Sequence, residues 1–153
     1  MRFHTENELE HFRFEGAFLA EIQQMPGYFY LILDNVIILP ENSTHRDIRE
    51  MRCNNLEIRI QEGQLLQLVE EGYNLYNANG DLTERVEDTM IDAAAFNETL
   101  KSLYTTESTI YSIEKNASDY IIAIDGEERT YTLTISGSGD TEDWDRYLNL
   151  ESM

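Results

Sequence analysis

Two glycines and a dense group of acids stand near the end of the chain, in the stretch GSGDTED at 137–143. A dinucleotide-binding turn uses glycines so that a phosphate can approach the backbone at the start of a helix. Gly137 and Gly139 fit the first two positions, but Glu142 stands where the third glycine is required. The neighbouring carboxylates would also repel a phosphate. We therefore expect no nucleotide site and no cofactor here.

The same segment carries one tryptophan among acids, and its apolar residues are spaced as on one face of a helix. This spacing predicts a short C-terminal helix at about 140–149. In one interpretation the tryptophan packs in the core. In the other, an acidic cluster with an aromatic anchor binds a basic protein partner. The residues of this cluster are Asp140, Glu142, Asp143, Trp144 and Asp145.

A second unusual segment, at 41–55, has neither the two-residue period of a strand nor the 3.6-residue period of a helix. It predicts a long loop, and it carries Arg46, Arg49 and Arg52. Arginines on a long loop can receive a carboxylate or a phosphate. The alternative is that they pair with the protein's own excess of acids.

Other constellations of reactive residues are weak. His4, His11 and His45 lack the spacing of zinc ligands, so we predict no metal site. Cys53 is the single cysteine and has no catalytic signature around it. Neighbouring carboxylates are inevitable among 30 acids, and no Gly-x-Ser-x-Gly motif is present. We predict no catalytic residue, and the sequence favours a non-enzymatic protein without deciding the question.

Composition limits the partners. The 153 residues have a formal net charge of −19, which disfavours nucleic acid and anionic membranes as partners. The longest apolar run, 28–39, is shorter than the roughly 20 residues that a membrane helix needs. No signal-peptide pattern is evident, and a lone cysteine forms no internal disulfide. We expect a single acidic globular domain spanning 1–153, located in the cytoplasm.

Short alternating segments separated by turn residues predict a mainly β (α+β) fold. We expect an antiparallel β-sandwich or open barrel of about 7–9 strands, with a central helix at about 91–104 in addition to the C-terminal one. Turns are predicted at Asp34-Asn35, where a kinked continuous strand is the alternative, and at 61–63, 77–81 and Asp125-Gly126.

These features support two functional hypotheses. The first is a protein-interaction module, such as a bacterial antidote or immunity-type protein or an assembly subunit, whose acidic surface binds a basic protein or another copy of itself. The second is a small-ligand-binding protein or hydrolase with a pocket bordered by the 41–55 loop.

Overall fold

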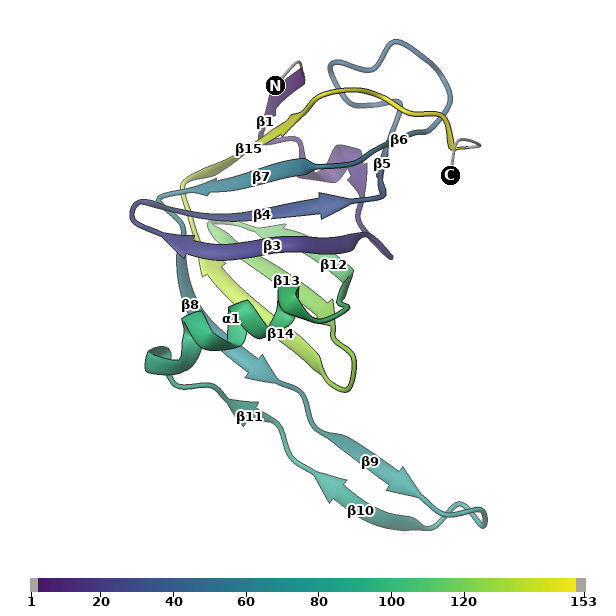
Figure 1. Cartoon of the computed structure of the whole chain (residues 1–153), viewed down its shortest axis with the longest axis vertical. Helices are drawn as coiled ribbons and strands as arrows, with labels where there is room; N and C mark the ends of the chain where they lie inside the picture. Colours follow the sequence, from purple (N-terminus) through teal and green to yellow (C-terminus); the bar gives the residue numbers. More distant parts are fainter. Residues whose placement is uncertain (1–2, 151–153) are drawn as a thin grey trace.

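The computed structural model describes residues 3–150, which fold mainly into antiparallel strands (Figure 1). Ten strands form one large sheet in the order β1-β15-β7-β4-β3-β12-β13-β14-β8-β11. Their bounds are β1 (Phe3–Glu6), β3 (Phe18–Met25), β4 (Tyr28–Asp34), β7 (Leu56–Gln61), β8 (Gln64–Glu70), β11 (Thr89–Met90), β12 (Thr109–Asn116), β13 (Asp119–Asp125), β14 (Thr130–Ser136) and β15 (Gly139–Trp144). The general β-rich, antiparallel class predicted from the sequence is therefore confirmed.

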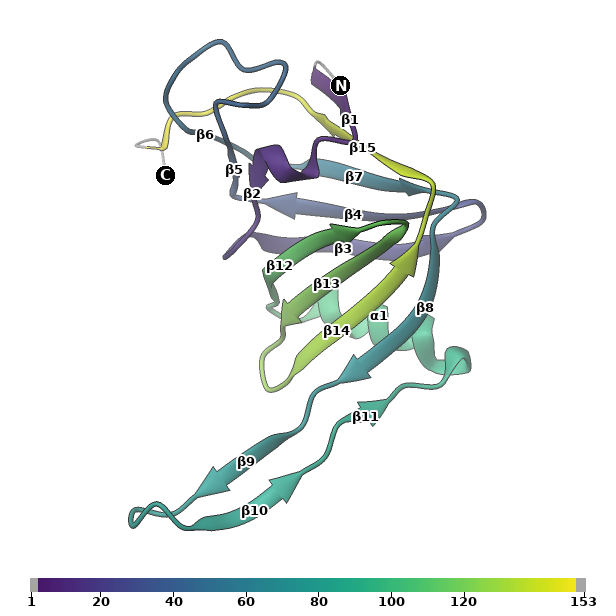
Figure 2. The same ribbon diagram turned by 180° about the vertical axis from the view of Figure 1, so that it is seen from behind.

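The large sheet consists of two halves that are joined weakly along the ladder. The link between β3 and β12 is a single residue pair, Phe18 with Thr109. The chain itself also connects the halves, because β7 continues into β8 and β14 continues into β15 (Figures 1 and 2). Side chains from both halves form one buried core, rich in isoleucine and leucine.

Two smaller sheets complete the strands. One contains β2 (Phe12–Arg13), β5 (Val36–Ile38) and β6 (Met51–Cys53) in the order β2-β5-β6. The other is a hairpin of β9 (Tyr73–Tyr76) and β10 (Leu82–Val86), which projects away from the body in both views (Figures 1 and 2).

The helix α1 (Phe96–Thr105) packs along β3 and buries Leu100 and Leu103. Phe96 and Tyr104 pack beside them, so the apolar face predicted for the central helix is confirmed. The helix begins later than the predicted residue 91, because a 3-10 turn, η2 (Ala93–Ala95), comes first. A second 3-10 turn, η1 (Leu9–His11), precedes β2.

Two parts of the predicted architecture are wrong. The described residues form 15 strands rather than 7–9, and the segment predicted as a C-terminal helix contains the strand β15. β15 lies between β1 and β7 and forms ladders with both. These long-range backbone hydrogen bonds outweigh the local helical spacing of the apolar residues.

Two of the predicted turns are not hairpins. β7 and β8, on either side of 61–63, pair with other strands and not with each other. At Asn35, which has a φ of 60°, the chain passes from β4 into β5 and changes sheet, so the structure is closer to the kinked-strand alternative. The predicted hairpins at 77–81 and at Asp125-Gly126 are confirmed.

Candidate functional site

A group of exposed apolar side chains lies on the β9–β10 hairpin, which we call the arm. Strand pairing places Tyr76 opposite Leu82 and Tyr73 opposite Val86. Because side chains alternate along a strand, Tyr73 and Leu75 lie on one face and Tyr76 on the other. All four tyrosine and leucine side chains are exposed, so neither face of the arm is covered by the body.

The root of the arm is fixed to the body. The Gly72 N–H donates to Asp88 Oδ1 at 2.6 Å, which ties the two strands together where they leave the body. A side chain at Gly72 would collide with the Val86 carbonyl, since a Cβ there would lie 1.9 Å from that oxygen. The Arg129 guanidinium lies 5.1 Å from the centre of the Tyr73 ring. At the tip, Asn77 Oδ1 accepts from the N–H groups of Asn79 and Asp81.

The sequence interpretation missed the arm as a site. The signal was present in YNLY at 73–76. Tyr73 and Leu75 are two residues apart and share one face of a strand, whereas Tyr76 lies on the opposite face, so both faces are apolar. A strand with one buried face would alternate apolar and polar residues.

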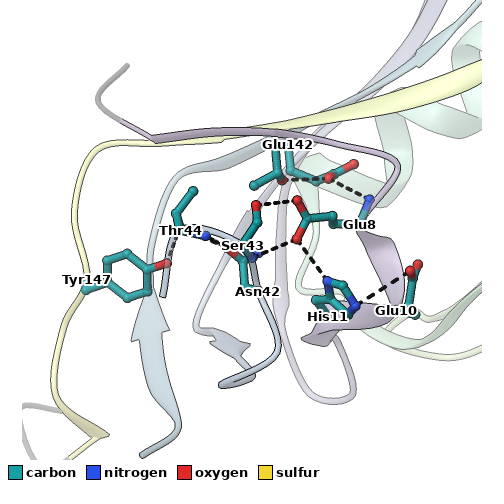
Figure 3. A network of polar contacts seen from close by, with 9 residues as sticks. Glu8, Glu10, His11, Asn42, Ser43, Thr44, Glu142 and Tyr147 are labelled. Atoms are coloured by element: carbon teal, nitrogen blue, oxygen red, sulfur yellow. Dashed lines mark hydrogen bonds and ion pairs between the residues drawn. The ribbon is translucent and has the colours of Figure 1, made fainter. Parts of the chain in front are cut away.

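The predicted loop at 41–55 contains the strand β6 (Met51–Cys53), and the part before this strand, 41–50, is held by a network of polar contacts (Figure 3). The carboxylate of Glu8 accepts from the Ser43 N–H at 2.9 Å, from the Ser43 hydroxyl at 2.5 Å and contacts His11 Nδ1 at 2.9 Å. Burial raises the pKa of Glu8, but the hydrogen bonds from Ser43 and His11 outweigh burial and bring that pKa below its usual value.

The next residues of this loop bind to the C-terminal segment. Asn42 Oδ1 accepts from both the N–H and the hydroxyl of Thr44, at 3.0 and 2.8 Å. The Thr44 hydroxyl is also hydrogen-bonded to the Tyr147 hydroxyl (Figure 3). The first part of the loop is therefore fixed at two neighbouring residues, Ser43 by Glu8 and Thr44 by Tyr147.

The three predicted loop arginines do not converge on one site. Arg46 lines a pocket with Phe3, His45 and Tyr147. Arg49 pairs with Asp47 at 2.9 Å and borders a separate hollow beside Leu150.

Arg52 is buried in β6, and its backbone pairs with that of Leu148. Arg52 Nη1 donates to Asn54 Oδ1 at 3.3 Å. Ligand binding at Arg46 and Arg49 stays a prediction, whereas Arg52 has no free surface to offer.

The predicted acidic cluster is not a single surface. Asp140, Glu142 and Trp144 alternate along β15 and point into the core, with exposed fractions of 2%, 0% and 0%. Asp143 is half-buried and contacts His4 Nδ1 at 2.6 Å, while Asp145 is exposed. A partner could reach only these last two, and their role in binding stays a prediction.

The buried carboxyls of Asp140 and Glu142 form a polar cluster inside the core. Glu142 Oε1 accepts from the Thr5 hydroxyl at 2.8 Å and from the Glu8 N–H at 3.2 Å. Burial raises the pKa of Glu142 well above its usual value, and a hydrogen bond with Asp140 raises it further. Both effects favour the protonated form of Glu142 at neutral pH.

Cys53 is fully buried, and burial raises the pKa of its thiol to about 12. A thiolate is the reactive form of cysteine, so this side chain is an inert core residue.

Within residues 3–150, no group of three or more histidine, cysteine, aspartate or glutamate side chains could hold a metal ion. No helix in the same range is long and apolar enough to cross a membrane.

Comparisons with protein-family models, with curated proteins and with solved structures give no match to this chain.

Proposed function

We propose that this chain is a non-enzymatic protein-interaction module that binds a basic protein partner through the arm. The observation that carries the proposal is the exposure of Tyr73, Leu75, Tyr76 and Leu82 on both faces of a projecting hairpin. An immunity-type protein, an antidote or a subunit of an assembly would use such an arm in the same way.

The physical argument begins with the stability of the hairpin. A two-stranded hairpin without a covered face is at best marginally stable in water. Here the body covers little of the apolar side chains, because Arg129 contacts only Tyr73 and only Val86 among the strand residues of the arm is partly buried. A partner that covers either face would remove this apolar area from water, and tyrosine is a common anchor in such interfaces.

Charge favours a basic partner over a second copy of the chain. The arm and its root carry four acids, Asp81, Glu84, Glu87 and Asp88, and one arginine, Arg85, which pairs with Glu87. The whole chain has a net charge of −19. Two copies would repel each other, whereas a basic surface would be attracted to the arm and oriented by it.

The test is site-specific photo-crosslinking. The photoreactive residue p-benzoylphenylalanine replaces Tyr76 in one protein and Tyr111 in a control. The two tyrosines are matched in exposure, at 61% and 60%, but Tyr111 lies on β12 of the body. Both proteins are irradiated in lysate of the source organism at low and at high salt.

The proposal predicts an adduct with a basic protein at position 76, weaker at high salt and missing at position 111. The captured protein, once purified, should bind the wild-type chain at least about tenfold more tightly than a Leu75→Ser/Tyr76→Ser variant. Adducts between two copies of the chain, or equal adducts at both positions, would contradict the proposal.

A further inference from the structure

A small pocket lies between the 41–50 loop, the N-terminal strand β1 and the C-terminal segment, far along the chain from the arm. Its volume is about 250 Å³. We call it the loop pocket, and its lining residues are Phe3, Thr44, His45, Arg46, Asp47, Met51 and Tyr147. Small-molecule sites usually combine such apolar walls with a few fixed polar groups.

The aromatic walls are held in place by their neighbours. The Tyr147 ring packs edge-on against the rings of Phe3 and His45, with distances between ring centres of 4.9 Å and 5.1 Å. The Tyr147 hydroxyl is occupied by Thr44, which in turn is bound to Asn42 (Figure 3). The pocket is thus preorganised by contacts that do not depend on a ligand.

His45 offers a hydrogen-bond donor without an acceptor. The Asp47 N–H donates to His45 Nδ1 at 3.1 Å, so Nδ1 carries no proton and the proton of the neutral ring is on Nε2. Nε2 is buried and has no partner among residues 3–150. A buried donor of this kind usually has an acceptor, but this atom has almost no accessible surface, so His45 contributes its ring to the pocket wall rather than a hydrogen bond.

Among the charged side chains that line the pocket, Arg46 is available to bind an anion. Asp47 is paired with Arg49, and the hydrogen bonds from Arg49 lower the pKa of Asp47 to about 2. Arg46 is exposed and makes no hydrogen bond or ion pair within residues 3–150. In a protein of charge −19, an arginine that does not pair with the excess acids is free for an external anion.

We infer that the loop pocket binds a small aromatic carboxylate. The guanidinium of Arg46 can take the carboxylate, since arginine matches carboxylate geometry with two parallel donors. The rings of Phe3, His45 and Tyr147 with the Met51 side chain accommodate the aromatic body. The ligand can be a free aromatic acid or the C-terminal aromatic residue of a peptide, because both present the same groups.

The inference is tested by titration of the isotope-labelled protein, followed by the amide NMR shifts of residues 44–47. The probes are benzoate and N-acetylphenylalanine, which carries the carboxylate of a peptide C-terminus. Benzyl alcohol is the neutral comparison, and inorganic phosphate is the anion without a ring. We expect saturable shifts with at least one carboxylate, with a dissociation constant on the order of 1 mM. The tighter of the two carboxylates indicates whether a free acid or a peptide end is the better ligand.

Variants assign the roles. Arg46→Gln should weaken binding about tenfold or more, because a charged hydrogen bond is lost. Arg85→Gln removes the same charge from the arm and should leave the affinity unchanged.

Three results would overturn the inference. One is the lack of saturable shifts with either carboxylate up to about 30 mM. Another is equal binding of benzyl alcohol or phosphate, which would show that the carboxylate or the ring is not recognised. The third is an Arg46→Gln variant with wild-type affinity. None of these results bears on the arm, so the proposed function is tested separately.

Discussion

The hydroxyl of Tyr120 donates a 2.6 Å hydrogen bond to Oδ2 of Asp140 in the interior of the protein. Tyr120 lies on β13 and Asp140 on β15, so the bond connects the two halves of the large sheet. Tyr120 is fully buried, and burial followed by this hydrogen bond raises the pKa of its phenol. The bond therefore persists across the physiological pH range.

Removing the Tyr120 hydroxyl should destabilise the fold. In a Tyr120→Phe variant, Asp140 Oδ2 keeps only the Lys115 ammonium, at 3.4 Å. A buried acceptor that loses its partner costs about 1–3 kcal/mol, so the free energy of unfolding in urea should fall by that amount. Tyr111→Phe is the matched control, because Tyr111 is exposed, and its effect should stay within about 0.5 kcal/mol. Equal stabilities for the two variants would contradict the prediction.

We predict that Asp140 and Glu142 share a proton. The second oxygens of both carboxyls, Asp140 Oδ1 and Glu142 Oε2, are buried without a partner among the described residues if both groups are ionised. One proton held between the two groups satisfies both oxygens and removes one of two like charges. This agrees with the hydrogen bond that protonated Glu142 donates to Asp140, which raises the pKa of Glu142.

The shared proton makes stability depend on pH. The pKa of Glu142 is higher in the folded chain than in the unfolded chain, so between about pH 5 and about pH 8 unfolding releases a proton. The free energy of unfolding should therefore be greatest near the lower end of this window and fall with rising pH, by up to about 1.4 kcal/mol per unit.

A Glu142→Gln variant should remove this pH dependence. The side-chain oxygen of the glutamine can accept hydrogen bonds from the Thr5 hydroxyl and the Glu8 backbone N–H. Its NH₂ group can donate to the Asp140 carboxylate at every pH. The measurement is the difference between wild-type and variant unfolding free energies from urea titrations at several pH values. Contributions common to both proteins, such as the raised pKa of His4 beside Asp143, cancel in this difference. A difference that does not change with pH would refute the shared proton.

The sequence predicted the elements that are stabilised by residues close together in the chain. The hairpin at Asp125-Gly126 and the apolar face of α1 depend on neighbouring residues, and both are present in the structure. β15 could not be predicted this way, because its formation depends on ladders with β1 and β7, which are distant in sequence. Its acids also contradict the rule that a core face is apolar, and only their mutual pairing in the fold explains them.

For a related reason the sequence did not predict the arm as a site, and of the loop pocket it predicted only the border formed by the 41–55 loop and the candidate Arg46. The turn NANGD predicts a hairpin, but exposure of both its faces depends on the body of the protein ending at Gly72. Likewise, the free state of Arg46 follows from Asp47 pairing with Arg49 rather than with Arg46, which no spacing rule specifies.

The segment Gln61-Glu62-Gly63 is the clearest case in which the local sequence predicts one structure and distant strands impose another. It has the composition of a hairpin turn, but it is the corner at which the chain passes from β7 to β8, between the halves of the sheet. At this corner the Gly63 N–H donates to the Ile60 carbonyl at 3.1 Å. A Cβ on Gly63 would lie 2.6 Å from that carbonyl oxygen and 2.8 Å from the backbone nitrogen of Phe29.

A Gly63→Ala variant should therefore be strongly destabilised. Both contacts involve backbone atoms that are fixed in β7 and β4, so the collision cannot be relieved by a side-chain rotation. We expect the free energy of unfolding in urea to fall by about 2–3 kcal/mol. Gly16→Ala is the control for conformational strain alone, since Gly16 has a φ of +83° and open space around its Cβ position. That variant should lose about 1 kcal/mol. If Gly63→Ala cost no more than Gly16→Ala, the close approach of this corner to the backbones of β7 and β4 would be disproved.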